Sequence, residues 1–425
     1  MNGLINTGTP GDFNIPFYQR PGVRLDELPF GPGIPIGIEQ VTNPQIGVSG
    51  AYGAWGDSYD NEALIGFIEG QLHQSLCCEE QINLSSLGFN YRHLIPPLSH
   101  EEDIDLEVSV GAKFLREAAH ANGWETSEVD AVLLGMTAPV TDDYTERVAR
   151  EAGIPESAVK LSVHKACDSS VGAMHIALNP NLDFLGQLGR GLAEKLAGKK
   201  VLVGGLEGLS RILRPSRDIN ALQLFGNGVG VIGMIPGKTV QFIVGKAHEV
   251  FDEKGVLAVH MYYPYHRQRE AGGSLLEVSQ AGQNHIRVAG LMKEPDQEDV
   301  PVEMAGLMGM VKLFVRNGVQ VVGEVYRNYR KKMEELGTSQ KSIIITIAHH
   351  ANYKINSLMA IQLEKEGIPL SIPWLLSEFG NVSAASTMIA FMRQLSKLKP
   401  GDHVLFDGFG AGTYYDVLVV TFGTG

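Results

Sequence analysis

A lone cysteine, Cys167, stands in the stretch KLSVHKACDSSVGAMHIALNP, between a short apolar run and a series of small residues. The apolar run predicts a strand, and the small residues predict a helix that begins just after the cysteine. Backbone N–H groups in the first turn of a helix are unpaired and carry partial positive charge, which favours a thiolate. Cys167 is therefore a candidate nucleophile for acyl groups. The alternative is a buried thiol that only fills space, as free cysteines commonly do.

Two later loops carry polar groups that suit acyl transfer. His349 directly follows the apolar run IIITI, and Asn381 lies in the stretch FGNVSAAS. A neutral imidazole and a carboxamide can both donate hydrogen bonds to a carbonyl oxygen. Backbone N–H groups of Cys167 and of Ala411, in the Gly-rich turn DGFGAG, could bind the oxyanion that forms when a carbonyl is attacked. Each of these residues alone is also compatible with an ordinary structural role.

Strand-like and helix-like stretches alternate around these loops. VDAVLLGM, KLSV, KKVLVGG and GVGVIGMI are short apolar runs, and amphipathic stretches such as DLEVSVGAKFLREAAHANG separate them. This alternation predicts an α/β protein with mostly parallel sheets covered by helices. The same order returns later: a strand near Ile345 precedes Asn381 by 36 residues, as a strand near Ala131 precedes Cys167 by 36 residues. We therefore expect two duplicated halves whose equivalent loops meet.

Three parts are expected along the chain. Residues 1–42 are rich in Gly and Pro and have no sustained period. They predict either an extended arm that lies on the body or on a partner subunit, or a partly disordered tail. Residues 43–236 form the half that carries the cysteine, and residues 237–425 form the half that carries the histidine and the asparagine.

Composition excludes several classes of function. The 425 residues are 44% hydrophobic and carry a net charge of −13, which argues against nucleic acid or an anionic membrane as the main partner. Two of the three cysteines, Cys77 and Cys78, are adjacent, so a disulfide scaffold is not expected and a reducing, cytoplasmic setting fits better. No apolar run reaches membrane-spanning length, and no Cys/His cluster has the spacing of a zinc site, so we expect neither a membrane span nor a metal.

Five motifs in order resemble the thiolase superfamily and, more narrowly, the β-ketoacyl-(acyl-carrier-protein) synthase III enzymes. They lie at 225–230 (FGNGVG), 304–306 (MAG), 349–352 (HHAN), 380–386 (GNVSAAS) and 408–412 (GFGAG). The resemblance extends from about Gln45 to Phe422. It implies a thiolase fold with αβαβα layers, a homodimer, no bound cofactor, and a catalytic triad of Cys167, His349 and Asn381.

The resemblance also implies a reaction, the decarboxylative Claisen condensation of fatty-acid or polyketide-like synthesis. Cys167 would take an acyl group from a thioester, and His349 and Asn381 would hold the carbonyl oxygen of a malonyl-type extender. Loss of carbon dioxide would leave an enolate that attacks the acyl-cysteine. Four alternatives stay open: acyl transfer to an alcohol or amine, non-decarboxylative condensation of long acyl chains, a non-catalytic thiolase-fold subunit, and a cysteine hydrolase.

The implied substrates are coenzyme A or carrier-protein thioesters. In the family a tryptophan and an arginine help to hold coenzyme A, and here Ile82 or Asn83 and Ser86 stand in those places. This favours an acyl carrier protein as the partner. The residues expected at the pantetheine mouth are Arg211, Arg214, Arg217, Asn352 and Lys354. For a second basic stretch, YRNYRKK at 326–332, solvated surface charge explains the residues at least as well as docking of a carrier protein.

The sequence also departs from the family near the nucleophile and in one loop. Asp168 follows the cysteine and should raise the thiol pKa unless it points away or is paired, and Lys165 and His164 are candidates to offset it. His350 replaces a usual glutamine. In the family, the loop that here carries the acidic residues Asp142, Asp143 and Glu146 crosses the dimer interface. A glutamate of that loop serves as a base in some relatives, and helix capping is the alternative role.

Overall fold

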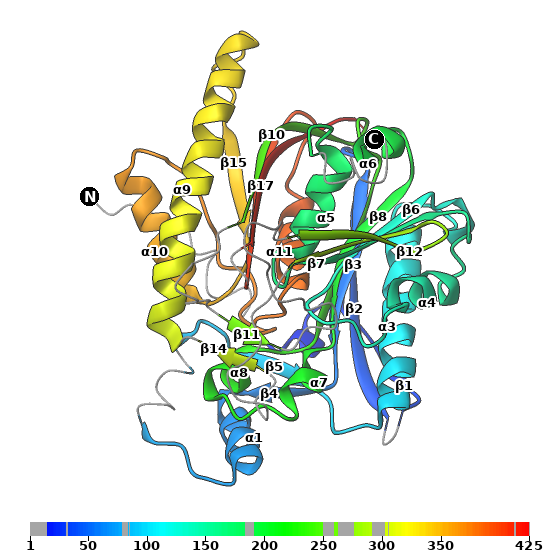
Figure 1. Cartoon of the computed structure of the whole chain (residues 1–425), viewed down its shortest axis with the longest axis vertical. Helices are drawn as coiled ribbons and strands as arrows, with labels where there is room; N and C mark the ends of the chain where they lie inside the picture. Colours follow the sequence, from blue (N-terminus) through cyan, green and yellow to red (C-terminus); the bar gives the residue numbers. More distant parts are fainter. Residues whose placement is uncertain are drawn as a thin grey trace.

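Two β-sheets of unequal size form the framework of the protein (Figure 1). The computed structural model describes residues 15–30, 33–78, 84, 86–182, 191–249, 259–261, 276–290, 302–304, 306–411 and 414–424. The larger sheet has the strand order β1 (Arg24–Leu28), β2 (Ile34–Asn43), β3 (Val48–Trp55), β9 (Gly228–Met234), β8 (Val201–Glu207), β6 (Ala131–Gly135), β7 (Val159–His164), β13 (His285–Gly290) and β12 (Leu276–Gly282). The smaller sheet has the order β10 (Val240–Glu249), β17 (Tyr414–Phe422), β16 (His403–Gly410) and β15 (Ile343–Ala348). Two short pairs join β4 (Asp57–Asp60) to β5 (Tyr91–Leu94) and β11 (Val259–Met261) to β14 (Val302–Met304).

Helices form three further layers around the sheets, as Figure 1 shows. Helices α5 (Ser169–Leu178) and α11 (Ala385–Leu395) lie between the two sheets. The outer face of the larger sheet is covered by α3 (His100–Ala121) and α4 (Tyr144–Glu151), and that of the smaller sheet by α9 (Gly306–Glu335) and α10 (Tyr353–Lys365). The remaining helices of the described residues are α1 (Asn61–Leu72), α6 (Leu192–Leu196), α7 (Leu209–Leu213), α8 (Ile219–Leu224) and the 3-10 turns Phe17–Gln19 and Thr126–Glu128. The predicted α/β class with αβαβα layers is confirmed.

The composition of each helix matches its layer. Every residue of α5, which reads SSVGAMHIAL, is buried, as expected for a helix with no polar face between two sheets. Helix α3 is amphipathic and buries one face only. It begins at a capping box in which the Ser99 hydroxyl accepts from Glu102 N, while the Glu102 carboxylate accepts from Ser99 N at 2.8 Å. No helix in the described ranges is both long and apolar enough to cross a bilayer.

The strand pairing repeats between the two halves, as the 36-residue spacing predicts. In the first half β6 runs parallel to β8, β8 antiparallel to β9, and β9 antiparallel to β3. In the second half β15 runs parallel to β16, β16 antiparallel to β17, and β17 antiparallel to β10. The prediction of mostly parallel sheets is wrong, because both sheets are mixed. Closely connected neighbours such as β2 and β3, or β16 and β17, can only pair antiparallel.

The predicted boundary at residue 42 is also wrong for the described part of the N-terminal segment. Strands β1 and β2 belong to the larger sheet, and β2 pairs with β3 from Ile36↔Trp55 to Asn43↔Val48. The segment is therefore sheet rather than an arm on its surface, and residues 1–14 lie outside the described residues. The predicted second half also contributes to the first: its hairpin β12–β13 joins the larger sheet, with β13 parallel to β7.

The chain ahead of β1 packs under the loop that carries Asn381. Phe17 is fully buried, and its ring centroid lies 4.6 Å from that of Phe379 and 5.8 Å from that of Tyr52. Arg20 Nη1 donates to the buried Glu378 carboxylate at 2.6 Å. Glu378 also pairs with the buried guanidinium of Arg393 on α11. The N-terminal segment thus fixes the chain immediately before the asparagine.

We expect Phe17→Ala to lower the free energy of unfolding by about 3–5 kcal/mol, because it empties a buried aromatic site. Ile15→Ala is the matched control: Ile15 is 45% exposed, so the change should stay within about 0.5 kcal/mol. Denaturant titration of both variants measures the difference. Equal effects of the two substitutions would show that the segment does not pack as described.

Candidate active site

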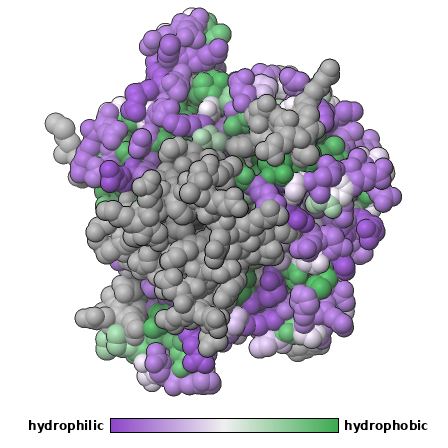
Figure 2. Space-filling model, in the orientation of Figure 1, coloured by the Kyte–Doolittle hydropathy of each residue, from purple (hydrophilic) through white to green (hydrophobic). Residues whose placement is uncertain are grey.

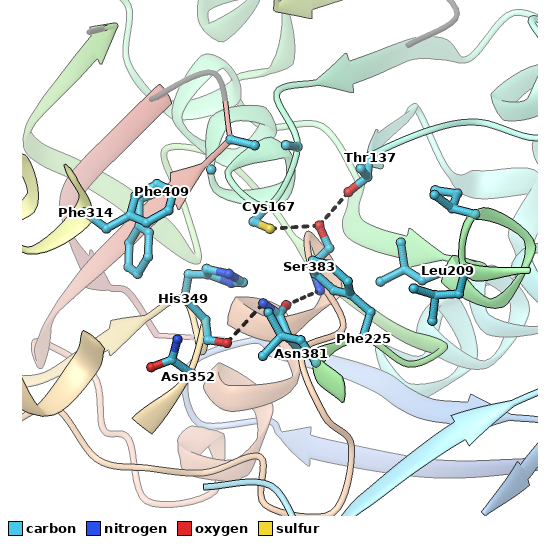
Figure 3. Close-up of a pocket in the computed structure, with 17 residues that line it drawn as sticks. Thr137, Cys167, Leu209, Phe225, Phe314, His349, Asn352, Asn381, Ser383 and Phe409 are labelled. Atoms are coloured by element: carbon cyan, nitrogen blue, oxygen red, sulfur yellow. Dashed lines mark hydrogen bonds between the residues drawn. The ribbon is translucent and has the colours of Figure 1, made fainter. Parts of the chain in front are cut away.

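The three residues predicted to do chemistry, Cys167, His349 and Asn381, line one cavity (Figure 3). Cys167 lies between β7 and α5, His349 follows β15, and Asn381 precedes α11. The other lining residues are mostly apolar: Thr137, Ala166, Leu209, Ile212, Leu213, Leu224, Phe225, Phe314, Ala351, Asn352, Ser383, Phe409, Gly410 and Ala411. The two halves thus bring their equivalent loops to one site.

The nucleophile loop is held in an unusual conformation. Ala166, directly before Cys167, has a φ of 49°, a left-handed conformation that costs a residue with a side chain about 1 kcal/mol or more. Burial raises the pKa of the Cys167 thiol to about 12, and the nearby carboxylates of Glu207 and Asp168 also raise it. The expectation that the helix N-terminus makes this thiol more acidic is therefore wrong. The partial charge of α5 does not outweigh the loss of solvent around a thiolate.

His349 is neutral, as the sequence predicts for a hydrogen-bond donor. Burial, with a smaller effect of His350, lowers its pKa to about 3. Its backbone N–H donates to Asp407 O at 2.8 Å, Asn356 Nδ2 donates to its carbonyl at 2.9 Å, and its ring packs edge-on against Phe409 at 5.0 Å. His350 has a structural role, because its Nε2 accepts from Leu375 N at 2.9 Å and its Nδ1 contacts Ala348 O at 2.8 Å.

Hydrogen bonds on both sides of its amide orient Asn381. Its Oδ1 accepts from Ser383 N at 2.8 Å, and its Nδ2 donates to Ala351 O at 3.2 Å. A carboxamide nitrogen carries two hydrogens, so one remains for a ligand in the cavity. Gly380, with a φ of 78°, and Ser383, with a φ of 43°, make the turn that aims Asn381 inward.

Gly410, at the end of β16 and directly before the predicted oxyanion donor Ala411, packs closely against the Cys167 loop. A Cβ atom on Gly410 would lie 2.9 Å from Cys167 N, 2.8 Å from Asp168 N and 2.6 Å from Lys165 O. Glycine is needed here because any side chain would displace the nucleophile loop. The next residue, Ala411, is buried in the cavity wall. The geometry is compatible with an oxyanion hole of Cys167 N and Ala411 N, which stays a prediction.

A polar chain that sequence reasoning missed runs from the nucleophile into the interior. Ser383 Oγ is hydrogen-bonded to Cys167 Sγ at 3.1 Å and lies 2.5 Å from Thr137 Oγ1 (Figure 3). Thr137 Oγ1 and Thr137 N donate to Glu207 Oε1 at 2.8 and 2.9 Å, and Ala384 N donates to the same oxygen at 3.0 Å. Burial raises the pKa of Glu207 to about 8. The available signal was an acid at the end of the apolar strand KKVLVGGLE.

Asp168 is paired rather than turned away. Its carboxylate lies 3.1 Å from Lys165 Nζ, which also binds Asp416, and His175 Nδ1 lies 2.6 Å from the second oxygen of Asp416. Burial and the charge of Asp416 raise the pKa of Asp168 well above its usual range. Lys165 is thus the partner of Asp168, but Asp168 still raises the pKa of the Cys167 thiol. His164 does not offset this effect, because burial lowers its pKa to about 3 and leaves it neutral.

The residues predicted at the pantetheine mouth fall into two groups. Arg211 Nε donates to Glu107 at 3.1 Å, and Arg214 binds Asp103 through two hydrogen bonds of 2.8 Å. These two guanidinium groups are already neutralised within the chain, whereas Arg217 is exposed.

The other two predicted mouth residues sit at the start of α10. Asn352 lines the cavity and caps α10 by accepting from Ile355 N at 3.0 Å. Lys354 is half-buried in the first turn of that helix. The coenzyme A positions Ile82 and Asn83 lie outside the described residues. A role in substrate binding stays a prediction for all five mouth residues.

The residues of the acidic loop make contacts within the same chain in this structure. Thr141 Oγ1 donates to Asp143 at 3.0 Å, and Arg147 Nε donates to the same carboxylate at 2.8 Å. Glu146 lies 3.6 Å from His285 Nδ1 on β13, and Arg287 Nη2 donates to Asp142 O at 3.2 Å. These contacts favour the structural alternative for the loop, although none of them tests a role in chemistry.

Comparisons with known proteins find similar proteins both by sequence and by structure. Residues 333–422 match the family model described as 3-Oxoacyl-[acyl-carrier-protein (ACP)] synthase III C terminal. A β-ketoacyl-[acyl-carrier-protein] synthase III of Clostridium tetani is 26% identical over 313 residues, which span 71% of this chain and 80% of the relative. The corresponding protein of Aquifex aeolicus is 25% identical over 331 residues, which span 76% and 86%. The crystal structure of the Pseudomonas aeruginosa 3-oxoacyl-(acyl carrier protein) synthase III superposes with a TM-score of 0.59 at 20% identity, covering 91% of this chain and 98% of that one.

The fold and the cavity together define the class of protein. It is a thiolase-fold protein with a cysteine, a histidine and an asparagine where its two halves meet. The sequence matches point to a condensing enzyme that is similar to the β-ketoacyl-[acyl-carrier-protein] synthases III.

We expect Gly410→Ala to slow acylation of Cys167 by about tenfold or more, because the added methyl group would overlap the backbone that carries the nucleophile. Gly66→Ala is the control, since a Cβ atom there meets nothing within 4 Å on helix α1. The rate of acyl-enzyme formation by intact-protein mass spectrometry measures both. Normal acylation by Gly410→Ala would contradict the close packing of β16 against this loop.

Proposed function

We propose that this enzyme joins an acyl group to a malonyl-type extender by decarboxylative Claisen condensation. The observation that carries the proposal is the shared cavity of Cys167, a neutral His349 and Asn381. Two neutral donors suit an enolate oxygen, which gains negative charge as carbon dioxide leaves. The curated relatives named above are β-ketoacyl-[acyl-carrier-protein] synthases III, which supports the same reaction.

In the first half-reaction Cys167 Sγ attacks the carbonyl carbon of an acyl thioester. The oxyanion accepts hydrogen bonds from the backbone N–H groups of Cys167 and Ala411, and the donor thiol leaves. In the second half-reaction His349 and Asn381 hold the extender carbonyl while its carboxylate is lost. The enolate carbon then attacks the carbonyl carbon of the acyl-cysteine, and the bond from that carbon to Cys167 Sγ breaks. The β-ketoacyl thioester is released, and Cys167 leaves as a thiolate that takes up a proton to return to the thiol.

The walls of the cavity favour an aliphatic acyl group. Leu209, Ile212, Leu213, Leu224 and Phe314 line it without a charged side chain among the lining residues. An apolar wall stabilises buried methylene groups and keeps water from the acyl-cysteine.

Three rival reactions fit the geometry less well. A cysteine hydrolase needs a basic histidine beside the thiol, whereas His349, with a pKa of about 3, is a very weak base. Acyl transfer to an alcohol or amine also needs a base in the cavity, and related acyltransferases often carry an acid where this chain has Asn381. Non-decarboxylative condensation needs a base to abstract a proton from the extender, and the lining residues provide no carboxylate.

Half-reaction assays separate the roles of the three residues. Cys167→Ala should form no acyl-enzyme, whereas His349→Ala and Asn381→Ala should still be acylated and should condense about a hundredfold more slowly or worse, since each loses a donor to the enolate. Mass spectrometry follows the first step, and product formation from pre-acylated enzyme follows the second. Near-normal condensation by both donor variants would exclude the decarboxylative mechanism.

A homodimer that takes its substrate from an acyl carrier protein in the cytoplasm is part of this proposal. The exposed Arg217 lies between α7 and α8, the two helices that supply Leu209, Leu213 and Leu224 to the cavity wall. The second basic stretch lies at the far, projecting end of α9, whose visible surface is largely hydrophilic (Figure 1, Figure 2). Arg330 in that stretch donates to the carbonyls of Lys341 and Ser339, which fits a structural and solvated role.

Charge reversal at Arg217 tests the docking site without breaking an ion pair. Arg217→Glu should raise the KM for a carrier-bound thioester about three- to tenfold at low salt, and less at high salt, because exposed charges are screened. A short pantetheine thioester should be used equally well by the variant and the parent. Lys331→Glu on the projecting end of α9 is the control, and an equal effect there would refute docking at Arg217.

A further inference from the structure

The resting thiol presents a problem that the triad does not solve. Burial holds the Cys167 pKa at about 12, so the thiol is protonated near neutral pH, and its proton must leave before attack. His349 is too weakly basic to take it. Among the described residues, the Ser383 hydroxyl is the group that is hydrogen-bonded to the Cys167 sulfur. The path from Ser383 onward therefore decides where the proton goes.

We propose that Ser383 and Thr137 form a proton relay that carries the Cys167 thiol proton to the carboxylate of Glu207. Cys167 Sγ, Ser383 Oγ, Thr137 Oγ1 and Glu207 Oε1 are linked in that order by distances of 3.1, 2.5 and 2.8 Å. Glu207 does not touch the cavity and acts only through the two hydroxyls. The relay concerns the acylation half-reaction of the proposed function.

The directions of the hydrogen bonds determine the direction in which the relay carries the proton. Glu207 Oε1 accepts from Thr137 Oγ1, Thr137 N and Ala384 N, an arrangement that suits an acceptor-only carboxylate. A hydroxyl has one proton, so Thr137, having donated to Glu207, must accept from Ser383. Ser383 then accepts from the thiol. After transfer every bond is reversed, and Ser383 donates to the thiolate.

The transfer balances without another reactant. The thiol proton moves to Ser383, the Ser383 proton to Thr137, and the Thr137 proton to Glu207, while the sulfur keeps the electron pair. The thiolate forms a bond to the acyl carbon, and the bond from that carbon to the donor sulfur breaks. The same chain run backwards returns the proton from Glu207 to the departing thiolate, which leaves as a thiol.

Burial suits Glu207 to the task. The side chains of Glu207 and Ser383 are only 2% and 1% exposed and that of Thr137 is 7% exposed, so bulk water does not compete along the path. The same burial raises the pKa of Glu207 to about 8, which makes it a stronger base than an exposed carboxylate and places it near physiological pH.

The other titratable groups around the relay have their own partners or stay neutral. From α4, Tyr144 donates to Glu107 O, and burial raises its pKa well above its usual range. From α3 and α7, Glu107 and Arg211 pair with each other at 3.1 Å. Beside Cys167, Asp168 is held by Lys165, and across the cavity burial keeps His349 neutral. Asp407 on β16 has a pKa that burial raises to about 7, but its carboxyl makes no hydrogen bond to the relay. On the hydrogen-bonded path itself, Glu207 is thus the group whose titration should govern thiol reactivity between about pH 6 and 9.

Alkylation of Cys167 by iodoacetamide tests the relay without any acyl substrate, so its failure is separable from failure of the proposed function. The exposed Cys77 and Cys78 are first replaced by serine. In this background the alkylation rate should rise with pH and level off above about pH 8, because the relay works only when Glu207 is ionised. Glu207→Gln should lower the rate at pH 8 about a hundredfold. Its rate should then rise steadily with pH, since only the thiol itself titrates.

Thr137 provides the variants that distinguish a relay from a structural role. Thr137→Val keeps the shape and removes the hydroxyl, so it should reproduce the slow rate and the altered pH profile of Glu207→Gln. Thr137→Ser restores the hydroxyl and should restore both. A Thr137→Val enzyme with the parent's rate and plateau, or a Thr137→Ser enzyme as slow as the valine variant, would overturn the relay.

Discussion

The crossing of the two buried helices α5 and α11 is the constraint on which the rest of the structure depends. Each helix starts at the site, one behind Cys167 and the other behind Asn381, and neither has a polar face to expose. Ser170 Oγ at the start of α5 donates to Ala384 O at 2.5 Å, and Glu207 at the end of β8 accepts from Ala384 N. These two bonds tie the helix starts of both halves together. The cavity exists where they meet because the strands around it end there.

Placing both helix starts in the interior requires that every nearby charge have a partner. Lys165 and Asp168 lie within the nucleophile loop, and Asp416 and His175 complete their network without reaching solvent. Removing one member of such a network would leave an uncompensated buried charge, which destabilises a protein strongly. In the loop before Asn381, the buried Glu378 carboxylate is likewise paired, with Arg20 and Arg393. The N-terminal segment is therefore part of the support of the site.

Much of this could be predicted from the sequence, because the motifs are local. Cys167, His349 and Asn381 each follow or precede a recognisable apolar element, and the repeated spacing already indicated that their loops meet. The strand β2 was missed because Gly and Pro obscured its alternation, although Ile34, Ile36 and Ile38 all point to the core. The partners of Arg211 and Arg214 could not be predicted either, because Glu107 and Asp103 lie more than a hundred residues away in the chain.

The sequence predicts a lowered pKa for the Cys167 thiol, whereas the structure gives a raised one, and this difference shows where reasoning from local sequence fails. A helix start is visible in the sequence, but the degree of burial and the approach of Glu207 from another strand are products of the whole fold. Both raise the thiol pKa. An apolar cavity around a thiol also offers little solvent to accept the thiol proton. Such a site must either keep a base inside or carry the proton through its own hydroxyl groups, and the described cavity wall contains hydroxyls but no carboxylate.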